Sequence, residues 1–104
     1  MNSKKYKLTM LPIFKNDFEE IINYIGYDLN NPSAARRLFD DAMDAILKRL
    51  ENPLSFAPYK SSKSRKNPYY RINVRNYSIF YVVIGDTMEV RRILYSKRNL
   101  DNFL

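Results

Sequence analysis

The spacing of the apolar residues changes along the chain and fixes the order of its secondary-structure elements. Apolar and polar residues alternate over residues 6–11, which predicts a half-buried strand. Over residues 12–29 the apolar residues fall three or four positions apart, as they do on one face of a helix. The same spacing returns over residues 32–51, where Asn31 is suited to the N-cap and Pro32 to the first turn. Two helices joined by so short a turn are expected to form an antiparallel hairpin.

Three further strands are predicted in the second half of the chain, after a loop over residues 53–68 that is rich in Pro, Lys and Ser. They cover residues 69–75, 77–84 and 87–95. The middle strand is apolar at nearly every position, which is typical of a central strand that is covered on both faces. Gly85-Asp86 between the last two strands predicts a two-residue hairpin turn.

The predicted order of elements, β-α-α-β-β-β, indicates an α+β fold in a single domain over residues 1–104. The helical hairpin is expected to pack on one face of a small, mainly antiparallel sheet. A chain of this length is expected to bury one core. The other face of the sheet is expected to be basic and aromatic. Residues 96–104 are expected to form either a short helix or an extended arm.

The positive charge of the chain lies in its second half. Residues 1–51 hold eight Lys or Arg and eight Asp or Glu, so their charges cancel. Residues 52–104 hold ten basic residues against Asp86, Glu89 and Asp101, and they account for the whole net charge of +7. Such one-sided charge favours an anionic partner, either a nucleic acid or an acidic protein segment.

The sequence contains neither Cys nor His, and each absence excludes a class of chemistry. Without Cys there is no disulfide, no thiolate nucleophile and no Cys-based zinc site. Without His there is no imidazole base, no Ser-His-Asp triad and no His-ligated metal. We therefore expect neither a cofactor nor a metal ion. No apolar run approaches the roughly 20 residues of a membrane span, and the first residues do not resemble a signal peptide. The sequence thus predicts a cytoplasmic protein without membrane contact.

Basic and aromatic residues near the predicted strand ends are the candidates for a functional site. Strand alternation places Arg71, Asn73 and Arg75 on one face of the sheet. The candidate catalytic residues are Arg71, Arg98, Tyr95 and Lys97. The candidate residues for binding a target or a nucleic acid are Lys60, Lys63, Arg65, Lys66, Asn73, Arg75 and Arg91. If the strands are neighbours, these side chains and Tyr81 are expected to form one concave cationic patch.

A patch of this kind has the side chains that RNA cleavage through the 2′-hydroxyl requires. A base takes the proton of the hydroxyl, cations stabilise the phosphorane, and an acid protonates the 5′-oxygen. Arg and Lys supply the electrostatic stabilisation. Tyr81 or Tyr95 would serve as acid or base only with a strongly shifted pKa. In the competing interpretation the Lys/Ser-rich loop is only solvated, Tyr77 and Tyr81 are packing residues, and Arg91 protects an edge strand from pairing.

Four segments of the chain, in this order, resemble the RelE/ParE superfamily of bacterial toxins. They are YKLTMLPIFKNDFEEIINYI at residues 6–25, NPSAARRLFDDAMDAILKRLENP at 31–53, YYRINVRNYSIFYVV at 69–83 and VRRILYSKRN at 90–99. The third and fourth segments carry the most specific part of the resemblance. Together the four segments cover nearly the full length of the chain.

The resemblance implies a growth-inhibiting toxin of a type II toxin–antitoxin system, neutralised by a small antitoxin that is encoded beside it. The superfamily has two branches that use one fold differently. RelE-like members are enzymes that cleave mRNA in the ribosomal A site, whereas ParE-like members bind DNA gyrase and inhibit it without catalysis. The antitoxin is expected to be an acidic segment that folds when it binds the toxin.

Individual positions match the superfamily unevenly. Arg71 lies where RelE-like enzymes place a strand lysine or arginine, and Arg98 matches the arginine that follows the last strand. Asn73 stands where those enzymes often carry a second lysine, and Ser78 stands where they carry an important arginine. Tyr95 occupies the place of a histidine in many ParE-like sequences and in some nucleases. These departures slightly favour the ParE-like branch. A RelE-like mRNA endonuclease is the alternative, and an inactive relative that only binds antitoxin is the third possibility.

Overall fold

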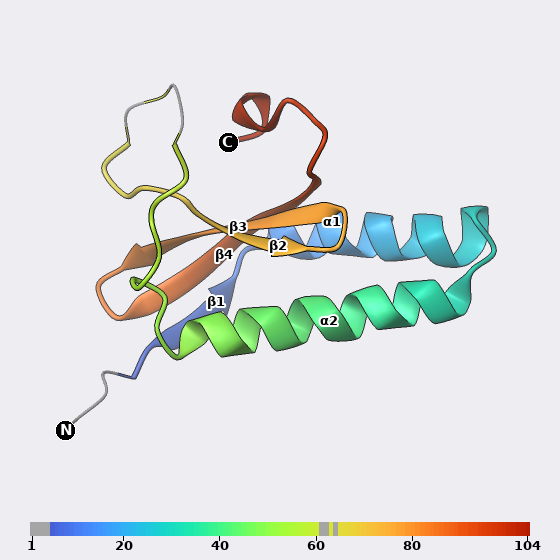
Figure 1. The fold of residues 1–104 in the computed structure, drawn as a ribbon, viewed down its shortest axis with the longest axis horizontal. Coiled ribbons are helices and arrows are strands. Elements are labelled where there is room, and N and C mark those ends of the chain that lie inside the picture. The colour runs from blue at the N-terminus through green and yellow to red at the C-terminus, as the bar shows by residue number, and fades with distance from the viewer. Residues whose placement is uncertain (1–4, 61–62, 64) are drawn as a thin grey trace.

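The computed structural model describes residues 5–60, 63 and 65–104 (Figure 1). Residues 1–4, 61–62 and 64, which belong to the predicted domain and to its basic loop, lie outside the described residues. All six predicted helices and strands are present, and two short helical turns accompany them. The elements are β1 (Lys7–Met10), α1 (Pro12–Asn23), η1 (Tyr24–Asp28), α2 (Pro32–Leu50), β2 (Tyr70–Val74), β3 (Tyr77–Ile84), β4 (Thr87–Tyr95) and η2 (Leu100–Asn102).

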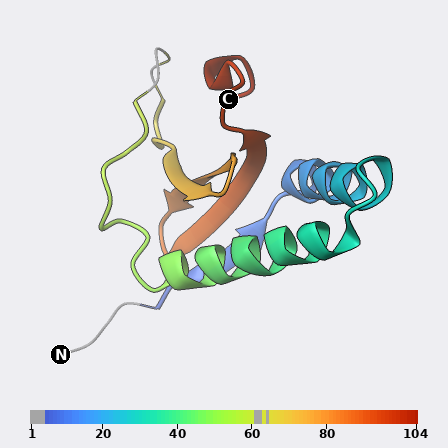
Figure 2. The same ribbon diagram turned by 45° about the vertical axis from the view of Figure 1, so that its right-hand side comes forward.

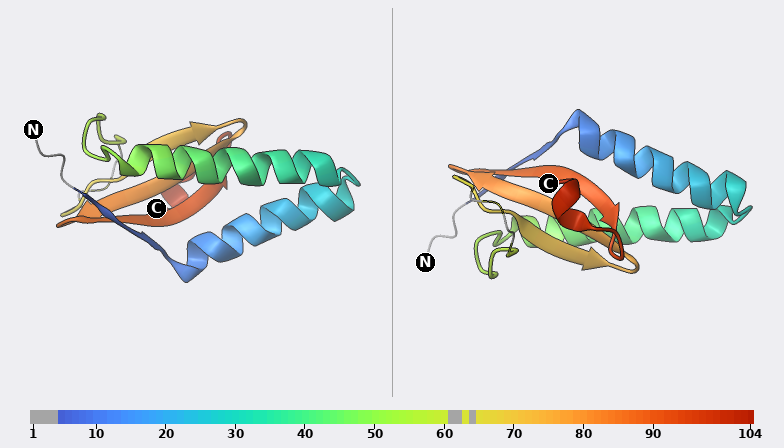
Figure 3. Two further views of the ribbon diagram at one scale, coloured as in Figure 1. Left: turned by 90° about the horizontal axis from the view of Figure 1, so that it is seen from below. Right: turned by 90° about the horizontal axis from the view of Figure 1, so that it is seen from above.

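The first predicted helix is present in two parts. α1 is α-helical to Asn23, and the chain continues through η1 as one π-helical turn to Asp28. Asn30 then adopts a left-handed backbone conformation with a φ of 50°, where the chain reverses. Asn31 caps α2 as predicted, because its side-chain oxygen accepts a hydrogen bond from the backbone N–H of Ala34 at 3.2 Å. The two helices form the expected antiparallel hairpin (Figure 3, left).

The four strands form one sheet in the order β1-β4-β3-β2. β2, β3 and β4 are consecutive antiparallel neighbours joined by two-residue turns, whereas β1 pairs in parallel with β4 at the edge. Gly85 forms the predicted turn between β3 and β4 with a φ of 62°, a conformation that glycine adopts at little cost. The α+β class and the mainly antiparallel sheet are confirmed.

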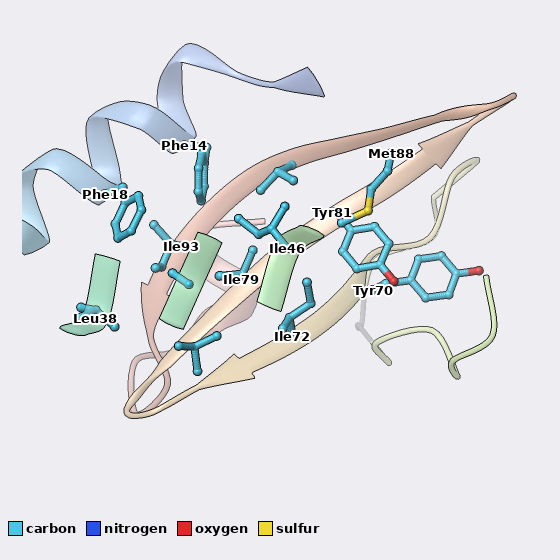
Figure 4. Close-up of a cluster of buried hydrophobic side chains, with 13 residues drawn as sticks. Phe14, Phe18, Leu38, Ile46, Tyr70, Ile72, Ile79, Tyr81, Met88 and Ile93 are labelled. Atoms are coloured by element: carbon cyan, nitrogen blue, oxygen red, sulfur yellow. The ribbon is translucent and has the colours of Figure 1, made fainter. Parts of the chain in front are cut away.

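The main core lies between the helical hairpin and one face of the sheet. Phe14 and Phe18 on α1 and Leu38 and Ile46 on α2 point toward the sheet, where they meet Ile79 and its inward-facing neighbours (Figure 4). Each fully buried side chain of this size contributes roughly 1.5–3 kcal/mol to stability. This core therefore holds the helices on the sheet.

The opposite face of the sheet, called the outer face below, was expected to be basic and aromatic, and in the structure it is also partly covered. It carries a second cluster of buried side chains: Tyr69, Phe80, Val82, Leu94 and Leu100. Tyr59 from the loop and Leu104 from the C-terminus pack against this cluster. η2 and the end of the loop lie on this side of the sheet, away from the helices (Figure 2; Figure 3, right). β3 is therefore buried on both sides, as its continuous apolar sequence predicted.

One largely buried ion pair connects α1, β4 and the C-terminal residues. Arg92 donates from Nε and Nη2 to the two carboxylate oxygens of Asp17 at 2.8 and 3.0 Å, and from Nη1 to the backbone oxygen of Phe103 at 3.1 Å. The backbone N–H of Ile93 donates to the same carboxylate at 3.3 Å. The hydrogen bond to Asp17 raises the pKa of Arg92 despite its burial. Both charges of the pair are therefore satisfied where water is largely excluded.

The buried phenol of Tyr81 gives the first testable prediction. Its hydroxyl donates to the backbone oxygen of Pro53 at 2.7 Å and accepts from Nη1 of Arg49 at 3.0 Å. Tyr81→Phe is expected to lower the free energy of unfolding by about 1–3 kcal/mol, because both partners lose a buried hydrogen bond. Urea denaturation measures this. Tyr27→Phe is the matched control, since Tyr27 is 80% exposed, and it is expected to change stability by less than about 0.5 kcal/mol.

The Arg92–Asp17 pair gives a second prediction. Asp17→Asn is expected to lower the free energy of unfolding by about 2 kcal/mol, because it leaves a largely buried guanidinium without its counter-charge. Asp40→Asn breaks the Arg36–Asp40 pair, whose side chains are 79% and 55% exposed, and is expected to cost less than about 0.5 kcal/mol. Equal losses in the two variants, measured by urea denaturation, would contradict a structural role for the Asp17 contact.

Candidate functional site

The structure separates the residues that the sequence grouped into one cationic patch. Arg71 and Asn73 lie on the outer face of the sheet. Tyr95 and Arg98 border a different pocket, beside α1. Arg75 turns toward α2. The predicted site is thus at least three separate places.

Arg71 is held on the outer face by a group of hydrogen-bonded polar side chains. Its Nε donates to Oδ1 of Asn73 at 2.8 Å and to Oγ of Ser78 at 2.9 Å. The fully buried Ser78 hydroxyl in turn lies 2.8 Å from the hydroxyl of Ser96. β2 and β3 pair in a register that sets Asn73 opposite Ser78, so the sheet itself brings these groups together. The guanidinium of Arg71 is therefore fixed in orientation at a half-buried position.

Tyr95 lies on the helix side of the sheet rather than beside Arg71. It is paired with Tyr77 across β3 and β4, and the two rings meet edge to face with centroids 5.8 Å apart. Burial raises the pKa of Tyr77, and the neighbouring phenols of Tyr95 and Tyr24 raise it further. Three phenols therefore approach one another here, and the one at their centre is harder to ionise than a free tyrosine.

Arg98 and Lys97 follow the end of β4. Arg98 lines a pocket of about 340 Å³ with Tyr95 and with Glu20 of α1, and its guanidinium lies 4.9 Å from the ring centroid of Phe103. Lys97 is exposed. Arg98 thus lies between the C-terminal residues and a pocket that Glu20 of α1 also lines.

The placement of Arg75 and Tyr81 in the predicted patch was wrong. Arg75 has a φ of 53° in the turn after β2, so strand alternation no longer applies to its side chain. Its Nη2 lies 2.7 Å from the carboxylate of Asp41 on α2. Tyr81 points into the main core, where burial raises its pKa although the Arg49 contact acts in the opposite direction. Tyr81 is a packing residue, as the competing interpretation held.

The loop cations gather around Tyr69 on the outer face. Lys60, Lys63 and Arg65 line a cavity of about 410 Å³ that also includes Tyr59 and Tyr69. The guanidinium of Arg65 lies 4.7 Å from the ring centroid of Tyr69. Lys66, the fourth loop cation predicted as a binding residue, is exposed and does not line this cavity.

A β-bulge brings Arg91 to the same region. The register between β3 and β4 shifts at Phe80 and Tyr81, so that Arg91 and Arg92 both project from the outer face. Arg91 lies 5.8 Å from the Tyr69 ring centroid and donates from Nε to Glu89 at 2.8 Å. β4 lies between β1 and β3, but its pairing with β1 ends at Val90, so at Arg91 the strand paired with β4 is β3.

Two contributors to the outer face were not predicted from the sequence. The ring centroid of Tyr59 lies 5.9 Å from the guanidinium carbon of Arg71, and the Tyr59 hydroxyl donates a hydrogen bond to Asp101 at 3.4 Å. Ser96 completes the hydroxyl pair with Ser78. Ser96 could have been suspected because it is polar and directly follows a strand end. Tyr59, in the middle of a proline-rich loop, carried no such signal.

The described part of the chain holds no group of three or more Asp or Glu side chains arranged to bind a metal ion. No helix within the described ranges is both long and apolar enough to cross a lipid bilayer.

Comparison with known proteins identifies the family. The family model described as the ParE toxin of the type II toxin–antitoxin system parDE matches residues 8–100. No curated protein sequence matches the chain significantly. Among solved structures, a chain of the chromosomal ParDE system from P. aeruginosa is similar, with a TM-score of 0.70 and 17% identity; the match covers 91% of this chain and 100% of that one.

A second solved structure is more distant in shape. A chain of the RelB-RelE antitoxin–toxin complex from Methanococcus jannaschii has a TM-score of 0.52 and 27% identity, with 92% of this chain and 99% of that one covered. The two structures agree with the observed fold, and the family model spans nearly all of the described residues. The chain therefore belongs to the ParE toxin family and is the toxin component of a type II toxin–antitoxin system.

Proposed function

We propose that this toxin stops growth by binding and inhibiting DNA gyrase, and that it does not cut RNA. The observation that carries the proposal is the separation of the candidate catalytic groups. Arg71 lies on the outer face, whereas Tyr95 and Arg98 border the pocket beside α1. A phosphodiester held against Arg71 would not have the phenol of Tyr95 beside it as an acid or base.

The phenol nearest to Arg71 is also poorly suited to proton transfer. Burial raises the pKa of Tyr59, and the adjacent carboxylate of Asp101 raises it further, against the opposing effect of Arg71. General acid–base catalysis works best when the pKa of the group lies near the working pH. Tyr59 therefore adds a contact surface to Arg71 rather than a reactive group.

The position of Ser78 supports the same conclusion. In RelE-like nucleases an important arginine stands at this place, as the sequence resemblance implies. Here the residue is a fully buried serine, and its hydroxyl is occupied by Arg71 and Ser96. A single fixed guanidinium remains where cleavage would need a group of cations around the phosphate. Membership of the ParE family supports the gyrase branch independently.

We further propose that the antitoxin is an acidic segment and that it covers part of the basic second half of the chain. The net charge of +7 arises entirely from residues 52–104, so charge complementarity favours this arrangement. A segment that orders only on binding can follow a surface as extended as this one.

A ribosome-dependent mRNA endonuclease is the second candidate function. The 27% identity with a chain of the RelB-RelE complex from Methanococcus jannaschii and the loop cations on the outer face favour it. An inactive relative that only binds antitoxin is the third candidate, and it is favoured by the missing cations at Asn73 and Ser78.

The decisive experiment gives the purified toxin two targets in parallel. Gyrase with relaxed plasmid is expected to lose supercoiling activity, while mRNA on programmed ribosomes, read by primer extension, is expected to stay intact. Ribosome-dependent cuts would refute the proposal in favour of the endonuclease. Activity in neither assay, combined with normal colony counts on expression, would identify an inactive relative.

Arg71 and Arg98 provide the matching mutational prediction. Arg71→Ala and Arg98→Ala are each expected to raise the toxin concentration for half-inhibition of supercoiling by about tenfold, which corresponds to about 1.4 kcal/mol of binding. Arg36→Ala, on the exposed surface of α2, is the control and is expected to have no effect. Unchanged inhibition by both Arg71→Ala and Arg98→Ala would show that gyrase does not contact these residues.

A further inference from the structure

Arg65 is the one guanidinium in the described residues with two buried nitrogen atoms that have no hydrogen-bond partner. Both Nε and Nη2 are buried and unpaired. The group lies 4.7 Å from the ring centroid of Tyr69, so the aromatic face fixes its position without satisfying its N–H donors. A buried donor without an acceptor is unfavourable, and native proteins rarely keep one without a reason. The geometry therefore points to a missing acceptor.

The same edge of an arginine is fully used elsewhere in this protein. Nε and Nη2 of Arg92 donate side by side to the two oxygens of the Asp17 carboxylate. This two-donor edge matches a group with two oxygens on one atom, which means a carboxylate or a phosphate. Arg65 presents the same pair of donors, but no carboxylate of the described residues accepts from them. The missing acceptor is accordingly an oxyanion from outside the described chain.

The surroundings of Arg65 favour a ligand that brings several negative charges. The cavity of about 410 Å³ is lined by Lys60, Lys63 and Arg65 together with two tyrosines and a proline, and no Asp or Glu is among its lining residues. The nearest acids on this face have other partners: Glu89 binds Arg91, and Asp101 accepts from Tyr59. Three cations around one cavity suit a polyanion better than one partner carboxylate.

The aromatic residues of the cavity also distinguish between types of nucleic acid. Tyr69 is buried, and guanidinium groups of Arg65 and Arg91 already lie against its ring. Tyr59 packs into the second apolar cluster and is contacted by Arg71. Both rings are thus engaged in contacts within the protein, whereas proteins that bind single strands stack unpaired bases on their aromatic rings. The site is therefore suited to the backbone of a duplex.

We propose that this cavity binds a backbone phosphate of double-stranded DNA, with the Nε and Nη2 edge of Arg65 on two phosphate oxygens and Lys60 and Lys63 beside it. The inference rests on the proposed function, because gyrase holds duplex DNA while it works. The toxin would then contact both the enzyme and its DNA. Contacts to phosphates carry no base information, so binding is expected to be independent of sequence.

Fluorescence anisotropy with a labelled 20-base-pair duplex tests the proposal at low salt. Three variants each remove one positive charge and so keep the net charge equal: Arg65→Gln, Lys60→Gln and Arg36→Gln. Arg65→Gln is expected to weaken binding about tenfold and to reduce the salt slope of log K by about one. Lys60→Gln is expected to weaken binding severalfold. Arg36 lies on the exposed surface of α2, and Arg36→Gln is expected to change the affinity for the duplex by less than about twofold.

Two checks keep the result interpretable. Arg65→Lys keeps the charge but loses the two-donor edge, so an affinity between those of the wild type and Arg65→Gln is expected. Lys60 is exposed, so Lys60→Gln tests the cavity even if Arg65→Gln unfolds. The proposal is overturned if Arg65→Gln and Lys60→Gln bind the duplex as tightly as Arg36→Gln does. It is also overturned if the wild type does not bind the duplex. Displacement of the duplex by polyglutamate at equal charge concentration also overturns it and assigns the cavity to an acidic protein.

A parallel supercoiling assay separates this inference from the proposed function. If Arg65→Gln loses DNA binding but still inhibits gyrase as well as the wild type, the phosphate site plays no part in inhibition and the inference fails alone. If the wild type binds duplex through Arg65 but leaves supercoiling unaffected, the proposed function fails and the phosphate site stands.

Discussion

The structure depends on the need to cover the sheet on both faces. β3 is apolar along both of its sides, so neither face of the sheet can be left to solvent. The helical hairpin covers one face with a large core. The loop before β2 and the C-terminal residues cover part of the other with a smaller cluster that includes Phe80 and Leu100. The outer face is only partly covered. It therefore combines buried aromatic side chains with charged side chains.

The Arg92–Asp17 pair shows how the two layers are tied together. Arg92 projects from the outer face because of the β-bulge in β4, yet its guanidinium reaches the carboxylate on α1 and a backbone oxygen near the C-terminus. The pair therefore links the helix layer, the sheet and the C-terminal residues through one group. Such a pair stabilises a specific arrangement only when its hydrogen bonds are complete, as they are here.

The distribution of cations follows a simple physical pattern. Several of the arginines have acquired an acid or polar partner: Arg75 has Asp41, Arg91 has Glu89, and Arg71 has a serine and an asparagine. A paired guanidinium is held in one orientation and is partly neutralised. The unpaired donors of Arg65 stand apart from this pattern.

The sequence could predict the elements because their signals are local. Alternation, three-to-four spacing, the Asn31 cap and the Gly85 turn each depend on a few neighbouring residues, and all of them were found where expected. The superfamily resemblance was predictable for the same reason, since it rests on the order of local segments. The two-sided burial of β3 also followed from its own residues.

The candidate site could be predicted only as far as alternation holds. Asn73 lies with Arg71 because both are within one regular strand. Arg75 and Tyr95 do not join them, since the turn after β2 ends the alternation and Tyr95 is paired on the opposite face. Contacts such as Arg92 with Asp17 join residues 75 positions apart, and no local pattern encodes them.

The sequence by itself therefore determined the order of helices and strands, the one-sided charge and the family. Only the tertiary structure decided which charges meet. The physical reason is that periodicity fixes the direction of a side chain relative to its own backbone, whereas strand register, the bulge at Arg91 and the packing of the loop on Tyr69 fix it relative to the rest of the protein.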